Sequence, residues 1–166
     1  MTETQTTQEL EIIEALFFAY RDFVGEPDGV LSKLGFGRAH HRVLHFVHRN
    51  PGMTVAVLLD ILQITKQSLA RVLKSLIDEG FIEQRPGPRD RRQRLLYTTD
   101  QGATLANDLI AIQSSRIGRA LHAVPAEQRP AIGLFLRSLR NQPTALTHGF
   151  AGNVQRDAGV DETPSE

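Results

Sequence analysis

Apolar residues recur at helical spacing near the start of the chain. Their spacing of three or four positions predicts a helix over 8–24 with one apolar face. The residues of this face are Leu10, Ile13, Phe17, Tyr20 and Val24. Further apolar residues widen the face, namely Ile12, Leu16, Phe18 and Phe23. A terminal helix that is apolar on more than one side usually has two packing partners, so we expect this helix to contact a second subunit.

The same pattern, together with the Gly, Pro and capping residues that interrupt it, predicts five more helices and one hairpin. The glycine- and proline-containing segment 25–29 is expected to end the first helix. The other expected helices span 36–49, 55–62, 66–79, 100–123 and 125–140, and the strands span 81–85 and 95–99. The last helix is expected to bury Ile132, Phe135, Leu136 and Leu139. The remaining chain, 141–166, lacks periodicity and is expected to be a mobile tail.

The helix over 66–79 has the clearest start and end signals in the sequence. Thr65 is a suitable N-cap, Ile64 and Leu69 are spaced as a hydrophobic staple, and Gly80 follows where a left-handed residue belongs. A three-residue turn separates this helix from the one over 55–62. Two short helices joined in this way predict a helix-turn-helix.

The polar face of the 66–79 helix carries side chains that suit contacts with DNA. Helical geometry places Leu69, Val72, Leu73, Leu76 and Ile77 on one side, and Gln67, Arg71, Lys74 and Ser75 on the other, with Ser68 at the edge. Arg can bind guanine with two hydrogen bonds, Gln can bind adenine, and Lys and Ser can bind phosphates. A polar outer face is also typical of any amphipathic surface helix, so the helix alone leaves both interpretations open.

The hairpin loop favours the nucleic-acid interpretation. Residues 85–94 contain five Arg and a single acid, Asp90, and Pro86-Gly87-Pro88 keeps the start of the loop extended. A basic protrusion beside such a helix suits phosphate contacts or insertion of Arg into a narrow minor groove.

The charge distribution agrees with that interpretation, although the total charge does not suggest it. The 166 residues have a formal net charge of zero, yet residues 1–37 carry −5, residues 38–94 carry +6 and residues 95–166 carry −1. The basic block coincides with the helix-turn-helix and the hairpin. The absence of Cys excludes disulfides, thiol redox switches and Cys-ligated zinc. No apolar run is long enough for a transmembrane helix, and the polar, acidic N-terminus does not look like a signal peptide.

These motifs resemble those of the MarR family of transcriptional regulators, which are dimeric winged helix-turn-helix proteins. The resemblance covers roughly residues 10–139. Its most specific part is Pro88-Arg89-Asp90-Arg91-Arg92 followed by Leu95, Leu96, Thr99 and Gly102. A second part is Ile64-Thr65-Lys66-Gln67-Ser68 followed by Val72, Leu76, Gly80 and Ile82. The sequence departs from the family pattern at Gly87, where Asp is common, and at Thr98, where an aliphatic residue is common.

The resemblance implies a mainly α-helical fold with a small β-hairpin wing and a helical dimerisation region. It implies a dimerisation helix and linker in 1–35, a DNA-binding lobe in 36–99, dimerisation helices in 100–140, and the tail in 141–166. The implied DNA contacts involve Thr65, Lys66, Gln67, Ser68, Arg71, Lys74, Arg89, Asp90, Arg91 and Arg92. Among these, Gln67, Ser68 and Arg71 would read bases, Lys66 and Lys74 would contact the backbone, and Arg89 or Arg91 would enter the minor groove. Asp90 and Arg92 would form a pair that holds the wing in shape.

The implied function is that of a cytoplasmic homodimeric regulator, a repressor relieved by a small ligand. Two-fold symmetry implies a palindromic duplex with half-sites about one helical turn, roughly 34 Å, apart. Family members usually bind an aromatic or anionic effector between the dimer helices and the DNA-binding lobe. The residues that suit such a pocket here are Phe17, Tyr20, Arg21, His41 and His45. Phe17 and Tyr20 fit an ordinary interface core equally well.

Other functions have weaker support in the sequence. His41 and His45 are spaced to chelate zinc, as in a metal-responsive regulator, but a third ligand would have to come from elsewhere, and packed histidines are the simpler interpretation. A winged-helix protein-interaction module without its own operator is the alternative from a different class. The chain has no phosphate loop, nucleophile elbow or His-Glu metal motif, so we expect neither catalysis nor a cofactor.

Overall fold

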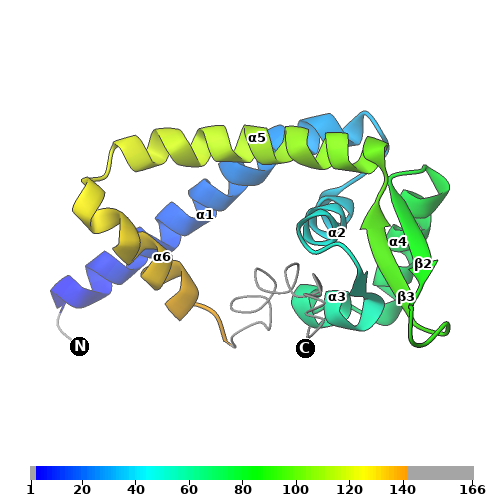
Figure 1. Ribbon diagram of the computed structural model, residues 1–166. Coiled ribbons are helices and arrows are strands. Elements are labelled where there is room, and N and C mark those ends of the chain that lie inside the picture. The colour runs from blue at the N-terminus through cyan, green and yellow to red at the C-terminus, as the bar shows by residue number, and fades with distance from the viewer. Residues whose placement is uncertain (1–2, 142–166) are drawn as a thin grey trace, which may run out of the picture.

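The computed structural model describes residues 3–141 and has two parts (Figure 1). The helical part contains α1 (Glu3–Ser32), α5 (Asp100–His122), a short 3₁₀ turn η1 (Ala126–Gln128) and α6 (Arg129–Ser138). The winged lobe contains α2 (Arg38–Arg49), β1 (Met53–Thr54), α3 (Val55–Leu62), α4 (Lys66–Asp78), β2 (Ile82–Pro86) and β3 (Arg94–Thr98). Helix α5 runs along the length of the molecule, and its first turns lie on the winged lobe. The predicted fold class, mainly helical with a small hairpin wing, is confirmed.

The sheet is small, antiparallel and ordered β1-β3-β2. Ile82 pairs with Thr98 and Pro86 pairs with Arg94, so the hairpin is in register from its base to its tip. Both predicted strands are present, each shifted by one residue at its ends. Strand β1 was not predicted, because two residues are too few to show an alternating pattern. It pairs Met53 with Leu96 and closes the sheet against the start of α3.

The core lies inside the winged lobe, where three amphipathic helices meet the sheet. On α4, Leu69, Val72, Leu73 and Leu76 are buried as predicted, and Ile77 is half-buried at the edge. They pack with Val43, Leu44 and Val47 of α2, Leu58 and Leu62 of α3, and Leu96 of β3. The helical periodicity of the sequence therefore identified the faces that form the core.

Threonine hydroxyls cap three helices of the molecule. Thr54 Oγ1 accepts a hydrogen bond from Val57 N at 3.3 Å, and Thr65 Oγ1 accepts one from Ser68 N at 3.1 Å. Thr99 does the same for the first turn of α5. Each cap satisfies an amide that the helix itself leaves unpaired, which explains why the predicted starts of α3 and α4 are correct. Gly80 has a φ of +76°, the left-handed conformation expected after α4.

The expected break at 25–29 is wrong, because α1 continues through it to Ser32. A proline inside a helix costs about 3 kcal/mol, but tertiary contacts offset this cost here. Pro27 is fully buried, and the neighbouring side chains of Glu26 and Asp28 form ion pairs with Arg116 and Arg38. Leu31 at the end of α1 belongs to the core of the winged lobe. The residues expected to form a linker are therefore a structural connection between the two parts.

The outer helices are much less buried than the sequence suggested. In the last helix, Phe135, Leu136 and Leu139 are 40%, 50% and 54% exposed, so their expected burial is wrong for the single chain. Along the apolar stripe of α1, Val24 is buried and Phe17 is 70% exposed. A single copy of the chain offers these side chains too few neighbours, since its core is formed by the winged lobe and the adjoining ends of α1 and α5.

Two further expectations concern the ends and the environment of the chain. The tail from residue 142 onwards lies outside the described residues. Within 3–141, none of the helices combines the length and the apolar character that a bilayer crossing requires.

The junction between the hairpin and α5 leads to a stability prediction. A Cβ on Gly102 would lie 1.9 Å from the carbonyl oxygen of Phe81, which is backbone and cannot rotate away. Gly102→Ala should therefore lower the free energy of unfolding by about 3 kcal/mol or more. Urea unfolding at fixed protein concentration measures this change.

Gly118→Ala is the matched control in the same helix, because a Cβ there meets no atom within 4 Å. It should leave stability unchanged or raise it by up to about 1 kcal/mol through helix propensity. Equal effects of the two substitutions would contradict the close packing at Gly102.

Candidate nucleic-acid interface

The outward face of α4 presents an exposed row of polar and cationic side chains. Lys66, Gln67, Arg71 and Lys74 are all exposed, opposite the buried leucines of the same helix. Thr65 and Ser68 lie at the N-terminus, where the Thr65 hydroxyl donates to Ser68 Oγ at 2.9 Å. The Thr65 side chain is therefore committed to the cap, whereas Ser68 keeps its own hydroxyl hydrogen for another partner.

The cations of this face differ in how they are paired. Lys74 forms an ion pair with Asp78 one turn later, with Nζ 2.5 Å from Oδ2. Within the described chain, Lys66 and Arg71 have no carboxylate within ion-pair distance. Lys66 and Arg71 are thus the cations of α4 that are most available to a ligand. A hollow of about 640 Å³ between α3 and α4 contains Lys66 and Lys74 in its lining.

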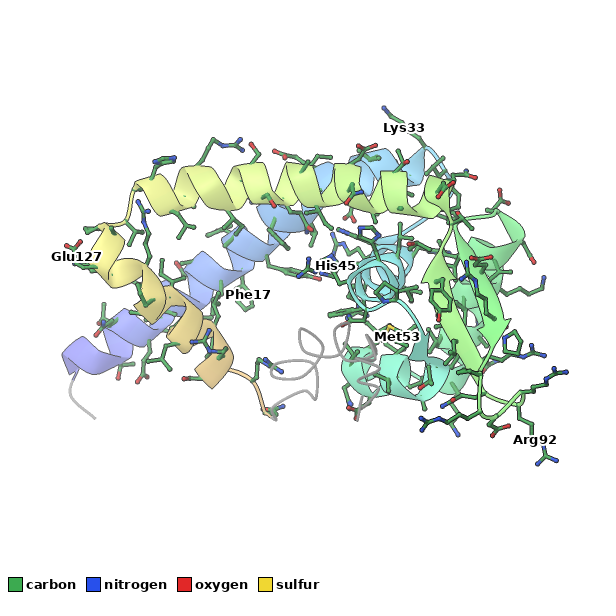
Figure 2. All side chains as sticks on the ribbon, viewed as in Figure 1. Phe17, Lys33, His45, Met53, Arg92 and Glu127 are labelled. Atoms are coloured by element: carbon green, nitrogen blue, oxygen red, sulfur yellow. The ribbon has the colours of Figure 1, made fainter. Side chains whose placement is uncertain are left out.

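The wing loop is a compact turn that exposes several arginines. Gly87 N donates to the carbonyl of Gln93 at 2.9 Å, and Gln93 N donates to the carbonyl of Asp90 at 3.0 Å. These bonds close the loop on itself, so Arg89, Arg91 and Arg92 stay exposed. Figure 2 shows Arg92 at the outer end of the wing.

Asp90 and Arg92 are in contact, but not as the expected side-chain pair. Asp90 Oδ1 accepts a hydrogen bond from the backbone amide of Arg92 at 2.9 Å, and the guanidinium forms no ion pair with Asp90 among the residues described. The carboxylate thus shapes the turn through the backbone, as Asp commonly does, and leaves the Arg92 side chain available. Gly87 also fits this turn, since a Cβ there would lie 2.8 Å from the Asp90 carbonyl oxygen.

Arg85 has a different role from the arginines of the loop. Its guanidinium lies 4.5 Å from the centre of the Tyr97 ring and also forms an ion pair with Glu83. It therefore braces the two strands of the hairpin rather than projecting from it. The sequence, which grouped Arg85 with the basic loop, carried no signal for this difference.

A cavity of about 280 Å³ lies where α1, α2 and α5 meet. Three of the five residues expected to bind an effector line it, namely Tyr20, His41 and His45. The other lining residues are Phe23, Val24, Arg38, Arg42, Phe46 and Gln113. Sequence reasoning missed Arg38 and Arg42, although both follow the helical spacing of His41 and His45 on α2.

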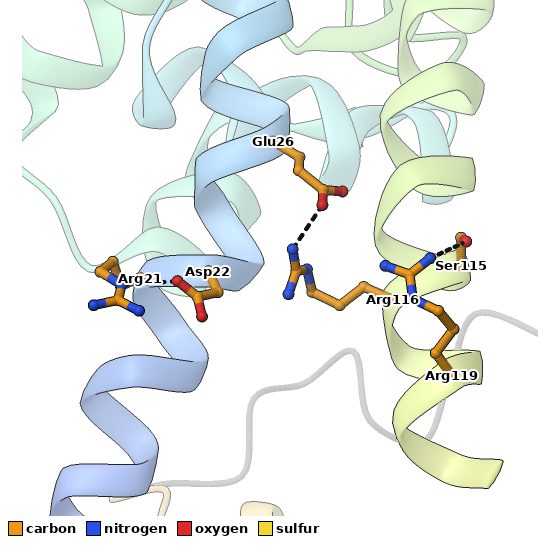
Figure 3. Close-up of polar contacts among 6 residues, drawn as sticks. All are labelled: Arg21, Asp22, Glu26, Ser115, Arg116 and Arg119. Atoms are coloured by element: carbon orange, nitrogen blue, oxygen red, sulfur yellow. Dashed lines mark hydrogen bonds and ion pairs between the residues drawn. The ribbon is translucent and has the colours of Figure 1, made fainter.

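Phe17 and Arg21 are not part of this cavity. Phe17 lies further along α1, as Figure 2 shows, and Arg21 forms an ion pair with Asp22 at 2.7 Å (Figure 3). Arg21 also lies over the ring of Phe18. The same close-up shows Glu26 of α1 and Arg116 of α5, whose side chains join the two helices with 2.6 Å between Oε1 and an Nη atom.

The histidines of the cavity have lowered basicity. Burial lowers the pKa of His41, and the negative charge of Asp28 opposes this shift. Burial also lowers the pKa of His45, and so do the neighbouring positive charges of His41, Arg49 and His48. Among the described residues, no group of three or more His, Cys, Asp or Glu side chains could hold a metal ion. The metal-responsive alternative based on His41 and His45 is therefore not favoured.

Comparisons with known proteins agree with the geometry of the lobe. Residues 34–93, which span α2, the helix-turn-helix and most of the hairpin, match the model of the MarR family. The HTH-type transcriptional regulator PetP of Rhodobacter capsulatus is 50% identical over 111 residues, which are 67% of each chain.

Solved structures show the same fold at lower sequence identity. FabT of Streptococcus pneumoniae, solved in complex with DNA, aligns with a TM-score of 0.69 and 17% identity, over 79% of this chain and 94% of that one. A MarR-family regulator of Listeria monocytogenes, complexed with a 26mer DNA, aligns with a TM-score of 0.66 and 19% identity, over 76% and 84% of the two chains. Half of the aligned residues are identical to those of a known regulator over two thirds of both chains, and the helix-turn-helix and the wing are both present. This protein therefore belongs to the MarR family of transcriptional regulators.

Proposed function

We propose that this regulator binds palindromic double-stranded DNA as a homodimer in the cytoplasm and acts as a repressor that a small ligand releases. The main support is the exposed face of α4 beside the wing. Arg71 forms no ion pair with any residue that the structure describes, and three arginines are exposed in the loop. Such a face has the donors for base edges and phosphates that a major-groove helix needs.

The dimer is supported by apolar surface that one copy leaves uncovered. The exposed large apolar residues of the helical part are Leu10, Ile13, Phe17, Phe18, Tyr20, Ile117, Leu134, Phe135, Leu136 and Leu139. They lie on α1, on the distal half of α5, and on α6 and its C-cap, whereas the exposed Leu34 lies in the turn between α1 and α2. Exposed apolar surface of this extent marks an interaction site, and a second copy presents the same surface to it.

Ligand release is supported by the cavity between the dimer helices and the winged lobe. Its lining combines the aromatic residues Tyr20, Phe23 and Phe46 with Arg42 and with Arg38, which forms an ion pair with Asp28. That chemistry suits an aromatic or anionic effector. A ligand that binds better to one spacing of the two α4 helices shifts the dimer towards that spacing.

The interaction-module alternative has no specific observation in its favour, but a binding experiment separates it clearly. Several phosphate contacts make affinity for a duplex fall steeply with salt. A chain that enriches no duplex from a random pool would support the module.

The first prediction concerns Arg71. On the duplex selected from a random pool, Arg71→Ala should weaken binding by about 1–3 kcal/mol and relax the preference at one base position. Repeating the selection with the variant measures both effects. Lys33→Ala, which removes a positive charge remote from the wing, is the control and should change neither (Figure 2). Equal weakening on all sequences would make Arg71 a phosphate contact.

The second prediction concerns the dimer. Sedimentation equilibrium should show a dimer at micromolar concentration, and Phe17→Glu should shift it towards monomer by placing a charge in the apolar surface. Thr104→Glu adds the same charge at an exposed site on α5 near the winged lobe and should leave the dimer intact. A monomeric wild type would contradict the dimer.

The third prediction concerns pH. His41 and His45 have a lower pKa in the folded chain than in the unfolded chain, so the unfolded state binds more protons below about pH 6.5. Stability should be complete above that pH and decrease as the pH falls towards the folded-state pKa values. Urea unfolding between pH 7.5 and 5.5 measures the decrease. The variant with both histidines replaced by Gln should show a shallower dependence, and an unchanged slope would assign the effect to other groups.

A further inference from the structure

The imidazole of His48 joins three elements of the molecule. It lies in the last turn of α2, with Nε2 3.1 Å from Oδ1 of Asn107 on α5. Its Nδ1 is 3.4 Å from Oγ1 of Thr98 at the end of β3. Because an amide oxygen can only accept, Nε2 carries a proton and donates to Asn107. Nδ1 lies within hydrogen-bond reach of the Thr98 hydroxyl, which can either donate or accept.

The contact with Asn107 is a second polar attachment of α5 to the lobe. The first is at the start of the helix, where Thr99 Oγ1 donates to the Gly80 carbonyl at 2.6 Å and accepts from Gly102 N at 3.1 Å. One attached turn fixes the position of a helix but not its direction. Asn107 is seven residues beyond Asp100, or roughly 10 Å along the axis. Leu105, Ala106 and Leu109 pack into the core on either side of Asn107, and the hydrogen bond adds a directional polar contact to that packing.

The length of α5 amplifies small changes at this second attachment. A shift of about 1 Å at Asn107 tilts the helix by roughly 6° about its first turn, which moves its far end by about 3 Å, given a rise of about 1.5 Å for each of its residues. The far half of α5 belongs to the surface proposed to meet the second copy. The displacement is close to the ~3.4 Å spacing of successive base pairs.

We propose that His48 is a positioning residue that sets the angle between the winged lobe and α5, and thereby the half-site spacing that the dimer accepts. The inference rests on the proposed function, because spacing has a meaning only for a dimer on a palindrome. His48 acts through Asn107 and not through a base contact, so it affects where the second half-site must lie rather than which bases are preferred within one.

The test compares palindromes whose central segments differ in length by one base pair. The probes are the duplex selected by the wild type, the same duplex with its centre lengthened or shortened by one base pair, and a duplex with a single half-site. His48→Asn places its amide near the Nδ1 position and loses the Asn107 contact, whereas His48→Gln reaches the Nε2 position and retains it. Asn107→Leu removes the acceptor, and Asn107→Asp keeps it.

The wild type should bind the duplex with its selected spacing about tenfold more tightly than the lengthened or the shortened duplex. One directional hydrogen bond in each protomer can supply an affinity difference of this size. His48→Asn and Asn107→Leu should reduce this preference to about twofold, while His48→Gln and Asn107→Asp keep it. Affinity for the single half-site should be the same for all five proteins. Urea unfolding identifies any variant that fails to fold, and the two Asn107 variants decide the result if His48→Asn does not fold.

The outcomes separate this inference from the proposed function. A wild type that binds the palindrome no better than the half-site overturns the proposed function and the inference with it. A wild type with a clear spacing preference that His48→Asn and Asn107→Leu also retain overturns the inference alone. An equal loss of affinity in these two variants for the half-site and for every palindrome would also overturn it, since it would show a structural role only.

Discussion

The close contact between the backbone of Phe81 and the first turn of α5 is the constraint on which the rest of the molecule depends. Gly102 lies so near the Phe81 carbonyl that no side chain fits, and Thr99 bonds both to the loop after α4 and to the helix that it caps. The hairpin, the end of α4 and the start of α5 therefore move as one unit. The start of α5 is therefore joined to the lobe by direct contacts and not by a flexible linker.

The sequence predicted most of the winged lobe because the information there is local. The starts of α3 and α4 depend on Thr54 and Thr65, whose hydroxyls cap amides only three residues away. The buried leucines of α4 follow from helical periodicity alone. The same reasoning failed at Pro27, because what offsets the proline there is non-local: Pro27 itself is buried, and the side chains beside it form ion pairs with Arg38 and Arg116, which are distant in sequence.

The candidate site was predictable as a set of residues but not as a set of interactions. The polar face of α4 and the arginines of the loop could be identified from spacing and charge. Which cations are free could not be identified, since the pairing of Lys74 with Asp78 and of Arg85 with Glu83 depends on rotamers. The cavity was predicted in part, since Tyr20, His41 and His45 line it. Phe17 and Arg21 do not, because the level at which α1 crosses α2 decides which turn of α1 faces the cavity, and no sequence pattern encodes that crossing.

Pro27 has a consequence for the mechanics of α1. Proline has no amide hydrogen, so the carbonyl of Phe23 lacks the helical donor that every neighbouring carbonyl in the middle of the helix receives. Phe23 lines the cavity, which places this missing bond beside the space proposed for an effector. The long helix that links the uncovered apolar surface to the core of the lobe therefore has one backbone hydrogen bond fewer at the level of the cavity. An occupant of that cavity would lie against the turn of α1 that lacks this bond.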